Sequence, residues 1–422
     1  MASRSIGSGL IGKVLIVMTS TYRAVAILVL NGLVALACFE LVAIGYFNLN
    51  HSRTQPGVAM QLVGEGAPRE TVSYYASQDW AERFWYEFRL SRTQQFRPFV
   101  GWRRAPFKGQ TIEVDQNGVR VTPGANCSPN SFKVFTFGAS EMWGTGSPNW
   151  GTIPAHLQKG LETLREGPVC VMNFAESAYV SMQGVITLLM QLRSGNVPDV
   201  VLFYSVEDDI YSAYQSGRVG VLENLDQIAA RFEGKRKPEG LLDRVKATYS
   251  YKLVDLYMDK LTIAKPQEAG ANKVVNYESL GIDVGTLSDA VVQELLENYK
   301  VLSGLAQEYG FKYMFVVPPS VWRGEKSLTP EEQRMKEVAL QEEALHRLSA
   351  AVYRKLEVES VKYENFHSLT HVFDHYDALL WIDATHVTPD GNQLIATSLL
   401  ELLQGRKVVT SSCCAAGDGG MR

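Results

Sequence analysis

The chain has 422 residues, of which 46% are hydrophobic and 20% charged, an ordinary balance for a folded globular protein. The length allows one large domain or two smaller ones. Its formal net charge of -4 excludes the strongly basic surface of a typical nucleic-acid-binding protein. The 5 cysteines have no metal-site spacing, and nothing in their pattern requires a disulfide.

The first informative segment is an apolar run at residues 24–47, which reads AVAILVLNGLVALACFELVAIGYF. As a helix it measures about 36 Å, enough to cross a hydrocarbon core of about 30 Å. Glu40 lies in its last third, where a carboxylate can reach toward the interface. Basic residues precede the run and acidic ones do not, so we expect residues 1–23 in the cytoplasm and the rest outside it. A cleaved signal peptide is the alternative, although its apolar core is normally shorter.

The segment after the anchor is rich in Gly, Pro and polar residues and is interpreted as a linker over residues 48–72. Next, Trp80, Phe84 and Phe88 recur every four residues, which predicts an amphipathic helix packed on the domain behind it. Alternating residues around Asn117 and Gly118 predict a β-hairpin over residues 111–122. Residues 73–130 are therefore interpreted as a pre-domain of one aromatic helix and a hairpin.

From residue 131 to 404, short β-rich runs alternate with longer helical ones. This alternation predicts an α/β domain, with a parallel sheet covered by helices on both faces. We expect strands at 133–137, 169–173, 200–204 and 312–317, with a weaker fifth at 360–363, and helices at 151–164, 181–193, 288–309, 330 onward and 389–403. Residues 217–283 break the pattern and are interpreted as a helical insertion. The Gly-rich tail at 405–422 is expected to be disordered.

One serine and one short loop carry the candidate chemistry. The stretch VFTFGASEMWGTG places Ser140 at the carboxyl end of the first expected strand, where active sites of such sheets lie. A serine hydroxyl becomes a nucleophile when a histidine takes its proton and a carboxylate orients that histidine. Asp383 and His386 are three residues apart in the loop before the last helix, so we predict a triad of Ser140, His386 and Asp383.

With these residues in place, the chain resembles the SGNH (GDSL-like) hydrolases over roughly residues 134–403. Four blocks carry the resemblance in the family's order: FGAS, MNFAESAYVSMQ, FYSVEDDIYSAY and DATH. The resemblance implies a flavodoxin-like three-layer sandwich. The anchor, the aromatic pre-domain and the helical insertion are similar to those of membrane-anchored envelope members.

The resemblance also implies an oxyanion hole, and here the chain departs from the family. The expected donors are the N–H of the serine, the N–H of a glycine in the second block and an asparagine side chain in the third. Here Ala175 stands in the glycine slot and Asp208 in the asparagine slot, or Glu207 if the register slips by one, while Val206 replaces the third block's glycine. An ionised carboxylate cannot donate a hydrogen bond, so we expect a weakened oxyanion hole.

The resemblance implies a serine esterase or acyltransferase that acts on acyl groups, often acetyl, of envelope carbohydrate. It implies no cofactor or metal, and a location at the bacterial inner membrane with the main domain periplasmic or extracellular. The bilayer is the expected partner through residues 24–47, and envelope proteins through the insertion. The alternative is a catalytically impaired scaffold subunit that keeps the fold. A minor alternative is a zinc site at His367, His371 and His375, which would share one face of a helix.

Overall fold

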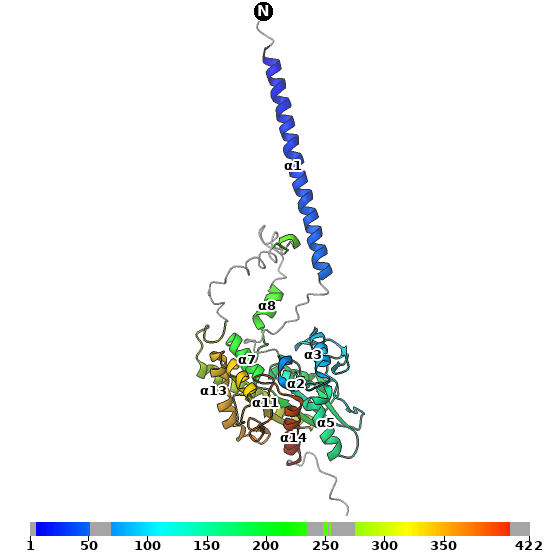
Figure 1. Cartoon of the computed structure of the whole chain (residues 1–422), viewed down its shortest axis with the longest axis vertical. Coiled ribbons are helices and arrows are strands. Elements are labelled where there is room, and N and C mark those ends of the chain that lie inside the picture. The colour runs from blue at the N-terminus through cyan, green and yellow to red at the C-terminus, as the bar shows by residue number, and fades with distance from the viewer. Residues whose placement is uncertain (1–5, 51–68, 234–247, 252, 255–274, 406–422) are drawn as a thin grey trace, which may run out of the picture. The chain divides into compact units, whose positions relative to one another are not determined.

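The computed structural model describes residues 6–50, 69–233, 248–251, 253–254 and 275–405. Most of the expected linker and tail, and the middle of the insertion, lie outside the described residues. The chain divides into two units, one of residues 1–58 with 231–272 and one of 59–230 with 273–422. Figure 1 shows the elements of both.

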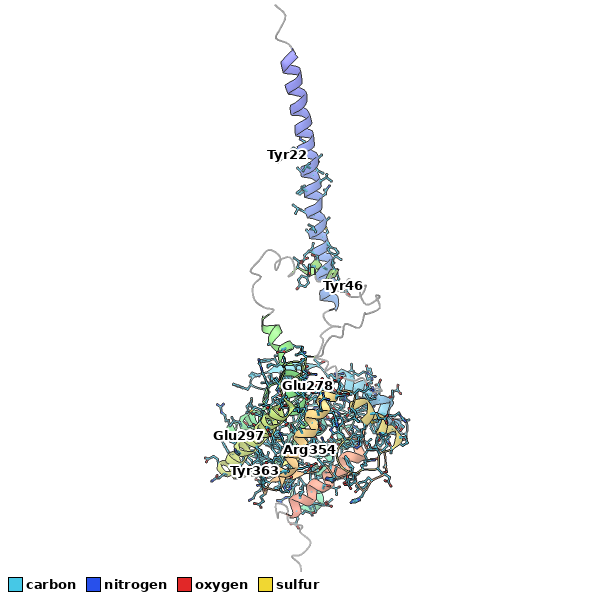
Figure 2. All side chains as sticks on the ribbon, turned by 90° about the vertical axis from the view of Figure 1, so that its left-hand side faces the viewer. Tyr22, Tyr46, Glu278, Glu297, Arg354 and Tyr363 are labelled. Atoms are coloured by element: carbon cyan, nitrogen blue, oxygen red, sulfur yellow. A yellow bond between two sulfur atoms is a disulfide. The ribbon has the colours of Figure 1, made fainter. Side chains whose placement is uncertain are left out.

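The first unit contains one long helix, α1 (Ile6–Asn50). Its stretch Tyr22–Tyr46 has a mean hydropathy of 2.4 and is long and apolar enough to cross a membrane. Figure 2 marks the two tyrosines at the ends of this stretch. Glu40 interrupts it, and its carboxylate accepts the backbone N–H groups of Tyr249 and Ser250 at 2.8 Å each. These bonds compensate part of the cost of a carboxylate in an apolar helix.

The second unit is built on a five-stranded parallel sheet in the order β6-β5-β7-β8-β9. Its strands are β5 (Phe132–Gly138), β6 (Val169–Asn173), β7 (Val200–Tyr204), β8 (Lys312–Val317) and β9 (Phe366–Ser368). In chain order this is 2-1-3-4-5, the flavodoxin-like arrangement, whose ligand sites lie at the carboxyl ends of the strands. The α/β fold class that the sequence predicts is therefore confirmed.

Helices cover both faces of the sheet (Figure 1). One face packs on α5 (Ile153–Leu164) and α14 (Pro389–Gly405). The other packs on four helices: α6 (Ser181–Arg193), α7 (Glu207–Ser216), α11 (Val284–Tyr309) and α13 (Glu343–Ser360). Neighbouring residues of one strand point to opposite faces of the sheet. Val134 packs in the core on the side of α5 and α14, and Phe135 packs in the core on the other side. This alternation is what a sheet buried on both sides requires.

The segment before the sheet packs into the same core as the sheet. It contains η1 (Arg69–Thr71), α2 (Ser73–Ala76), α3 (Ala81–Leu90) and the short strands β1 (Gln94–Arg97), β2 (Gly101–Arg104), β3 (Phe107–Lys108) and β4 (Glu113–Val114). Phe84 and Phe88 of α3 are buried, and Phe88 lies edge-on to Trp143, with ring centroids 6.0 Å apart. The expected packing of this helix on the domain is thus what the structure shows.

Two expected strands differ from the structure. Ser360 ends α13, and the fifth strand is β9, which starts six residues later. In the expected hairpin, the turn at Asn117 and Gly118 forms, but β4 pairs with β3 as a strand and meets Arg120 through an isolated bridge. Both errors arise because tertiary pairing decides which of several short β-prone runs forms a strand.

The remaining helices follow their sequence signals. In α12 (Pro330–Ala339), which begins at the expected residue, Thr329 and Glu332 form a capping box with Pro330 in the first turn. Between the sheet strands, α4 (Ser140–Trp143) and η2 (Asn149–Gly151) are single turns. The segment interpreted as a helical insertion contains α8 (Leu225–Glu233).

A disulfide joins Cys127 to Cys170, which the cysteine pattern does not reveal. Cys170 lies in β6 and Cys127 precedes β5, and their Cα atoms are 4.8 Å apart. Sequence spacing contains no information on this distance, because it arises from the sheet. Disulfides persist mainly in exported proteins, so this one agrees with a domain outside the cytoplasm.

Removal of this disulfide is expected to destabilise the domain. The bridge closes a separation of 43 residues, for which chain entropy gives a loss of about 3–4 kcal/mol. Urea unfolding of the Cys127→Ser, Cys170→Ala double variant should therefore show a clearly lower midpoint than the oxidised wild type. A reducing agent should lower the midpoint of the wild type and leave that of the variant unchanged. Equal midpoints for the two proteins would contradict the bridge.

Candidate active site

Ser140 begins α4, directly beyond the end of β5. Gly138 permits this sharp turn, because a Cβ there would lie 2.2 Å from the carbonyl oxygen of Tyr204 on the neighbouring strand. The side chain of Asn173, at the end of β6, donates to the carbonyl groups of Met142 and Trp143 at 3.1 and 3.3 Å. The serine is therefore held at the carboxyl edge of the sheet by both neighbouring strands.

The loop that carries Asp383 and His386 is a tight turn. A bridge between Trp381 and Val387 closes it, and the carboxylate of Asp383 accepts the backbone N–H groups of Thr385 and His386 at 2.9 and 2.8 Å. Buried Glu332 accepts the N–H groups of Leu380 and Trp381, at 2.9 and 3.2 Å, and forms a buried ion pair with Lys326. The loop is therefore held by hydrogen bonds within it, to Asp383, and by hydrogen bonds from its backbone to Glu332.

The structure brings the three predicted triad residues together. His386 Nε2 lies 2.7 Å from Ser140 Oγ, across 246 residues of sequence. His386 Nδ1 lies 2.9 Å from each carboxylate oxygen of Asp383. Ser140 and His386 are buried, with 6% and 4% of their surface exposed. This is the geometry in which an imidazole takes a serine proton while a carboxylate fixes its tautomer.

A fourth residue joins the group from the segment before the sheet. The guanidinium of Arg69 donates to Asp383 Oδ2 and forms an ion pair with it. Burial by itself raises the pKa of the Asp383 carboxyl, but the charges of Arg69 and His386 and its hydrogen bonds outweigh burial and hold the pKa far below its usual range. Asp383 is therefore ionised throughout the physiological range. No sequence motif singled out Arg69, because it lies more than 300 residues from its partner.

The structure offers a second residue for the expected glycine position of the oxyanion hole. The N–H of Ala175 donates to the side chain of Asn173 at 3.2 Å, so it is already engaged. Three residues later, Ala178 has φ 64, a left-handed conformation that favours glycine, and is buried. Within the parts of the chain that the structure describes, the N–H groups of Ser140 and Ala178 meet no acceptor. Ala178 is therefore a second candidate for the glycine slot beside Ala175, which the sequence places there.

The three acidic residues at the start of α7, Glu207, Asp208 and Asp209, have different partners. Glu207 accepts the hydroxyl of Tyr353 at 2.7 Å, and Asp209 accepts the N–H and the hydroxyl of Ser181 at the start of α6. These two carboxyls therefore hold helices together. Asp208, with 6% of its surface exposed, faces the carboxyl of Glu223 instead. Of the two residues that the sequence offers for the asparagine slot, Glu207 is bonded to Tyr353, whereas Asp208 faces Glu223.

Two further carboxyl groups near the triad were missed in the sequence. Glu141 directly follows Ser140; burial and the charge of Asp208 raise its pKa, although His386 opposes that shift. Glu223, with 1% of its surface exposed, lies beside Asp208. Isolated glutamates in a helix and a loop have no recognisable signature, so only the tertiary structure identifies them.

The residues of the minor zinc alternative do not share a helix face. His367 lies in β9, and His371, in a turn, bonds Asp374 at 2.7 Å. The premise of a common helical face is therefore wrong.

Comparisons with known proteins give matches at the level of structure. No family model and no curated protein matches the chain. A lipolytic protein of the G-D-S-L family from Veillonella parvula matches with TM-score 0.33 and 11% identity, over 64% of this chain and 96% of its own. A lipase from a goat rumen metagenome matches with TM-score 0.36 and 13% identity, over 64% of this chain and 97% of its own. An acetylxylan esterase from Geobacillus stearothermophilus matches with TM-score 0.30 and 14% identity, over 67% and 97%.

Removal of Arg69 should alter how ester hydrolysis depends on pH. In Arg69→Ala the Asp383 carboxylate loses its compensating cation, so it stabilises the imidazolium form of His386 more strongly. The acid limb of the pH–rate profile is then expected to move up by roughly one unit, equivalent to about 1.4 kcal/mol. The matched control is Arg89→Ala, which removes only an exposed ion pair with Glu70. An acid limb at the same pH in both variants would contradict the role of Arg69.

The fold is assigned from the strand order of this chain, and the candidate site is assigned from its own interatomic distances. By that order the chain has an α/β fold with the flavodoxin-like strand arrangement.

Proposed function

We propose that this protein is a serine ester hydrolase or acyltransferase that acts through Ser140, His386 and Asp383. The observation that carries the proposal is the 2.7 Å contact between His386 Nε2 and Ser140 Oγ, with Asp383 at 2.9 Å behind the ring. If Ser140 were only a turn residue between a strand and a helix, no buried histidine would be expected in contact with its hydroxyl.

The proposed reaction has two half-steps. Ser140 Oγ attacks the acyl carbon while His386 Nε2 takes the hydroxyl proton, and the tetrahedral intermediate then expels an alkoxide that recovers this proton from His386. Water, or the hydroxyl of an acceptor, attacks the acyl-serine by the same route and releases the enzyme. The N–H groups of Ser140 and Ala178 and the side chain of Asp208 are the proposed oxyanion donors.

For the substrate, we propose acyl groups, often acetyl, on envelope or extracellular carbohydrate. The resemblance to membrane-anchored envelope members motivates this choice. The Cys127–Cys170 disulfide and the apolar helix Tyr22–Tyr46 support a domain that is anchored to the bacterial inner membrane and exposed outside the cytoplasm. A scaffold subunit without turnover is the alternative outcome of the tests below.

The catalytic roles are tested by hydrolysis of p-nitrophenyl acetate with the full chain in detergent. Ser140→Ala and His386→Ala are each expected to lose about 10³-fold or more in turnover, and the double variant should lose no more, because the two act as a unit. Ser194→Ala, an exposed serine at the end of α6, is the control. A fluorophosphonate probe should label wild type and not Ser140→Ala. Full turnover in Ser140→Ala would end the nucleophile assignment, and an unlabelled, inactive wild type would favour the scaffold.

The membrane topology gives a separate prediction. Because basic residues cluster before the apolar run, a reporter fused after Thr54 should be active only if it functions outside the cytoplasm. The domain should also stay in the membrane fraction after cell lysis. A reporter active only in the cytoplasm would reverse the orientation, and a domain released in soluble form would indicate cleavage.

A further inference from the structure

Two buried carboxyl groups lie next to the proposed catalytic site, and within the described ranges no basic side chain forms an ion pair with either of them. Asp208 in the first turn of α7 and Glu223 in the loop beyond that helix lie within hydrogen-bonding reach of each other, and each shifts the pKa of the other. Among the described residues, no N–H or hydroxyl group donates to either oxygen of Glu223. A hydrogen bond between two carboxyls needs a proton on one of them, so this pair retains at least one proton as long as it stays bonded.

The position of Glu223 is set by the loop that carries it. The hydroxyl of Ser212 on α7 donates to the carbonyl of Val221 at 2.7 Å. The side chain of Gln215, also on α7, accepts the N–H of Asn224 at 3.0 Å and donates to its side chain at 3.2 Å. These bonds on both sides of Glu223 hold the loop against α7, so its approach to Asp208 is a fixed feature of the fold.

The pair lies at the same edge of the sheet as the triad. Tyr204, at the end of β7, pairs with Gly138 at the end of β5, so Asp208 and Ser140 follow neighbouring strand ends. The carboxyl of Glu141 interacts electrostatically with both Asp208 and His386. Asp208 therefore stands beside the triad, in the slot that the resemblance assigns to an oxyanion-binding asparagine.

The number of protons on the pair decides what Asp208 can donate. With one proton, the hydrogen of Asp208 is shared with the ionised Glu223, and a negative charge faces the oxyanion site. With two protons, Glu223 donates to the carbonyl oxygen of Asp208, and the hydroxyl of Asp208 is available to a third group. In this state Asp208 offers what an asparagine amide offers, a neutral donor.

We propose that Glu223 is a positioning residue for the oxyanion hole. When the pair holds two protons, Glu223 donates to Asp208, and only then can the hydroxyl of Asp208 donate to the oxyanion. This inference rests on the proposed serine-hydrolase function and extends it. On this proposal, Asp208 replaces the family's asparagine as an oxyanion donor, and the protonation of the pair determines whether it can donate.

The surroundings of the pair place this control near neutral pH. Burial raises the pKa of Glu223 to about 7, and burial together with Glu223 raises that of Asp208 well above its usual range. Among the described residues, the charged groups that act most strongly on the pair are acidic: Glu207 and Asp209 from α7 and Glu141 from α4. They add to the cost of each negative charge, so the second proton is expected to leave as the pH rises through about 7.

Ester hydrolysis as a function of pH tests the proposal directly, in the full chain in detergent with p-nitrophenyl acetate. The wild-type rate, corrected for the uncatalysed reaction, should fall above pH about 7, finally by about 10²–10³-fold. Glu223→Gln carries a permanent amide donor toward Asp208, so its alkaline limb should move up by one unit or more. Asp208→Asn should lose the limb altogether. Asp226→Asn is the control: it removes an exposed carboxyl three residues beyond Glu223, and the limb should stay in place.

The outcomes separate this inference from the proposed function. An active wild type whose alkaline limb is the same in Glu223→Gln overturns the inference and leaves the serine hydrolase standing. Turnover that appears only in Asp208→Asn also overturns it, because Asp208 would then be an obstacle at every pH. A wild type and variants that are inactive at every pH overturn both.

A second measurement reports on the protons without any turnover. Between the ordinary glutamate pKa of 4.5 and about 7, the folded pair holds a proton that the unfolded chain has lost. Stability therefore falls as pH rises across this window. The urea midpoint of wild type should decrease from pH 4.5 to 7, and that of Glu223→Gln should decrease less. Parallel curves would mean that Glu223 holds no extra proton, and the proposal would fail whatever the activity.

Discussion

The close approach of β5 and β7 at their carboxyl ends is the constraint on which the site depends. At Gly138 the backbone passes so near the carbonyl of Tyr204 that no side chain fits between them. This contact keeps the two strand ends in register while the chain turns sharply into α4 and α7. Ser140 and Asp208, 68 positions apart in the numbering of the sequence, thereby leave the sheet side by side. The rest of the site is arranged around these two turns.

Buried carboxyl groups around these turns differ because their partners differ. Asp383 has a guanidinium, an imidazole and two backbone N–H groups around it, so its charged form is stabilised in spite of burial. Asp208 and Glu223 have each other and further acids, so burial favours their protonated forms. One edge of one sheet therefore contains a permanent anion behind the histidine and, beside the serine, an acid pair that burial biases toward its protonated forms. This division resembles the way enzymes give two carboxyls opposite roles.

Much of the fold is readable from the sequence because its signals are local. The runs at 169–173, 200–204 and 312–317 coincide with β6, β7 and β8, and the capping box at Thr329 starts α12. The alternation of strands and helices was enough to predict a parallel sheet, because a helical crossover between consecutive strands leaves few alternatives. The fifth strand and the second half of the hairpin differ from the sequence expectation, because their β-propensity is weak and tertiary pairing decides which short runs form strands.

The sequence by itself determined the nucleophile, acid and base candidates, because Ser140 follows a strand and Asp383 and His386 share one turn. Only the tertiary structure decided the rest. Arg69, the Cys127–Cys170 bridge and the partnership of Asp208 with Glu223 each join segments whose distance no local pattern encodes. The backbone conformation at Ala178 likewise belongs to a loop held by its surroundings. A side chain's identity is local, whereas its protonation and its partners depend on burial and on groups that arrive from elsewhere in the chain.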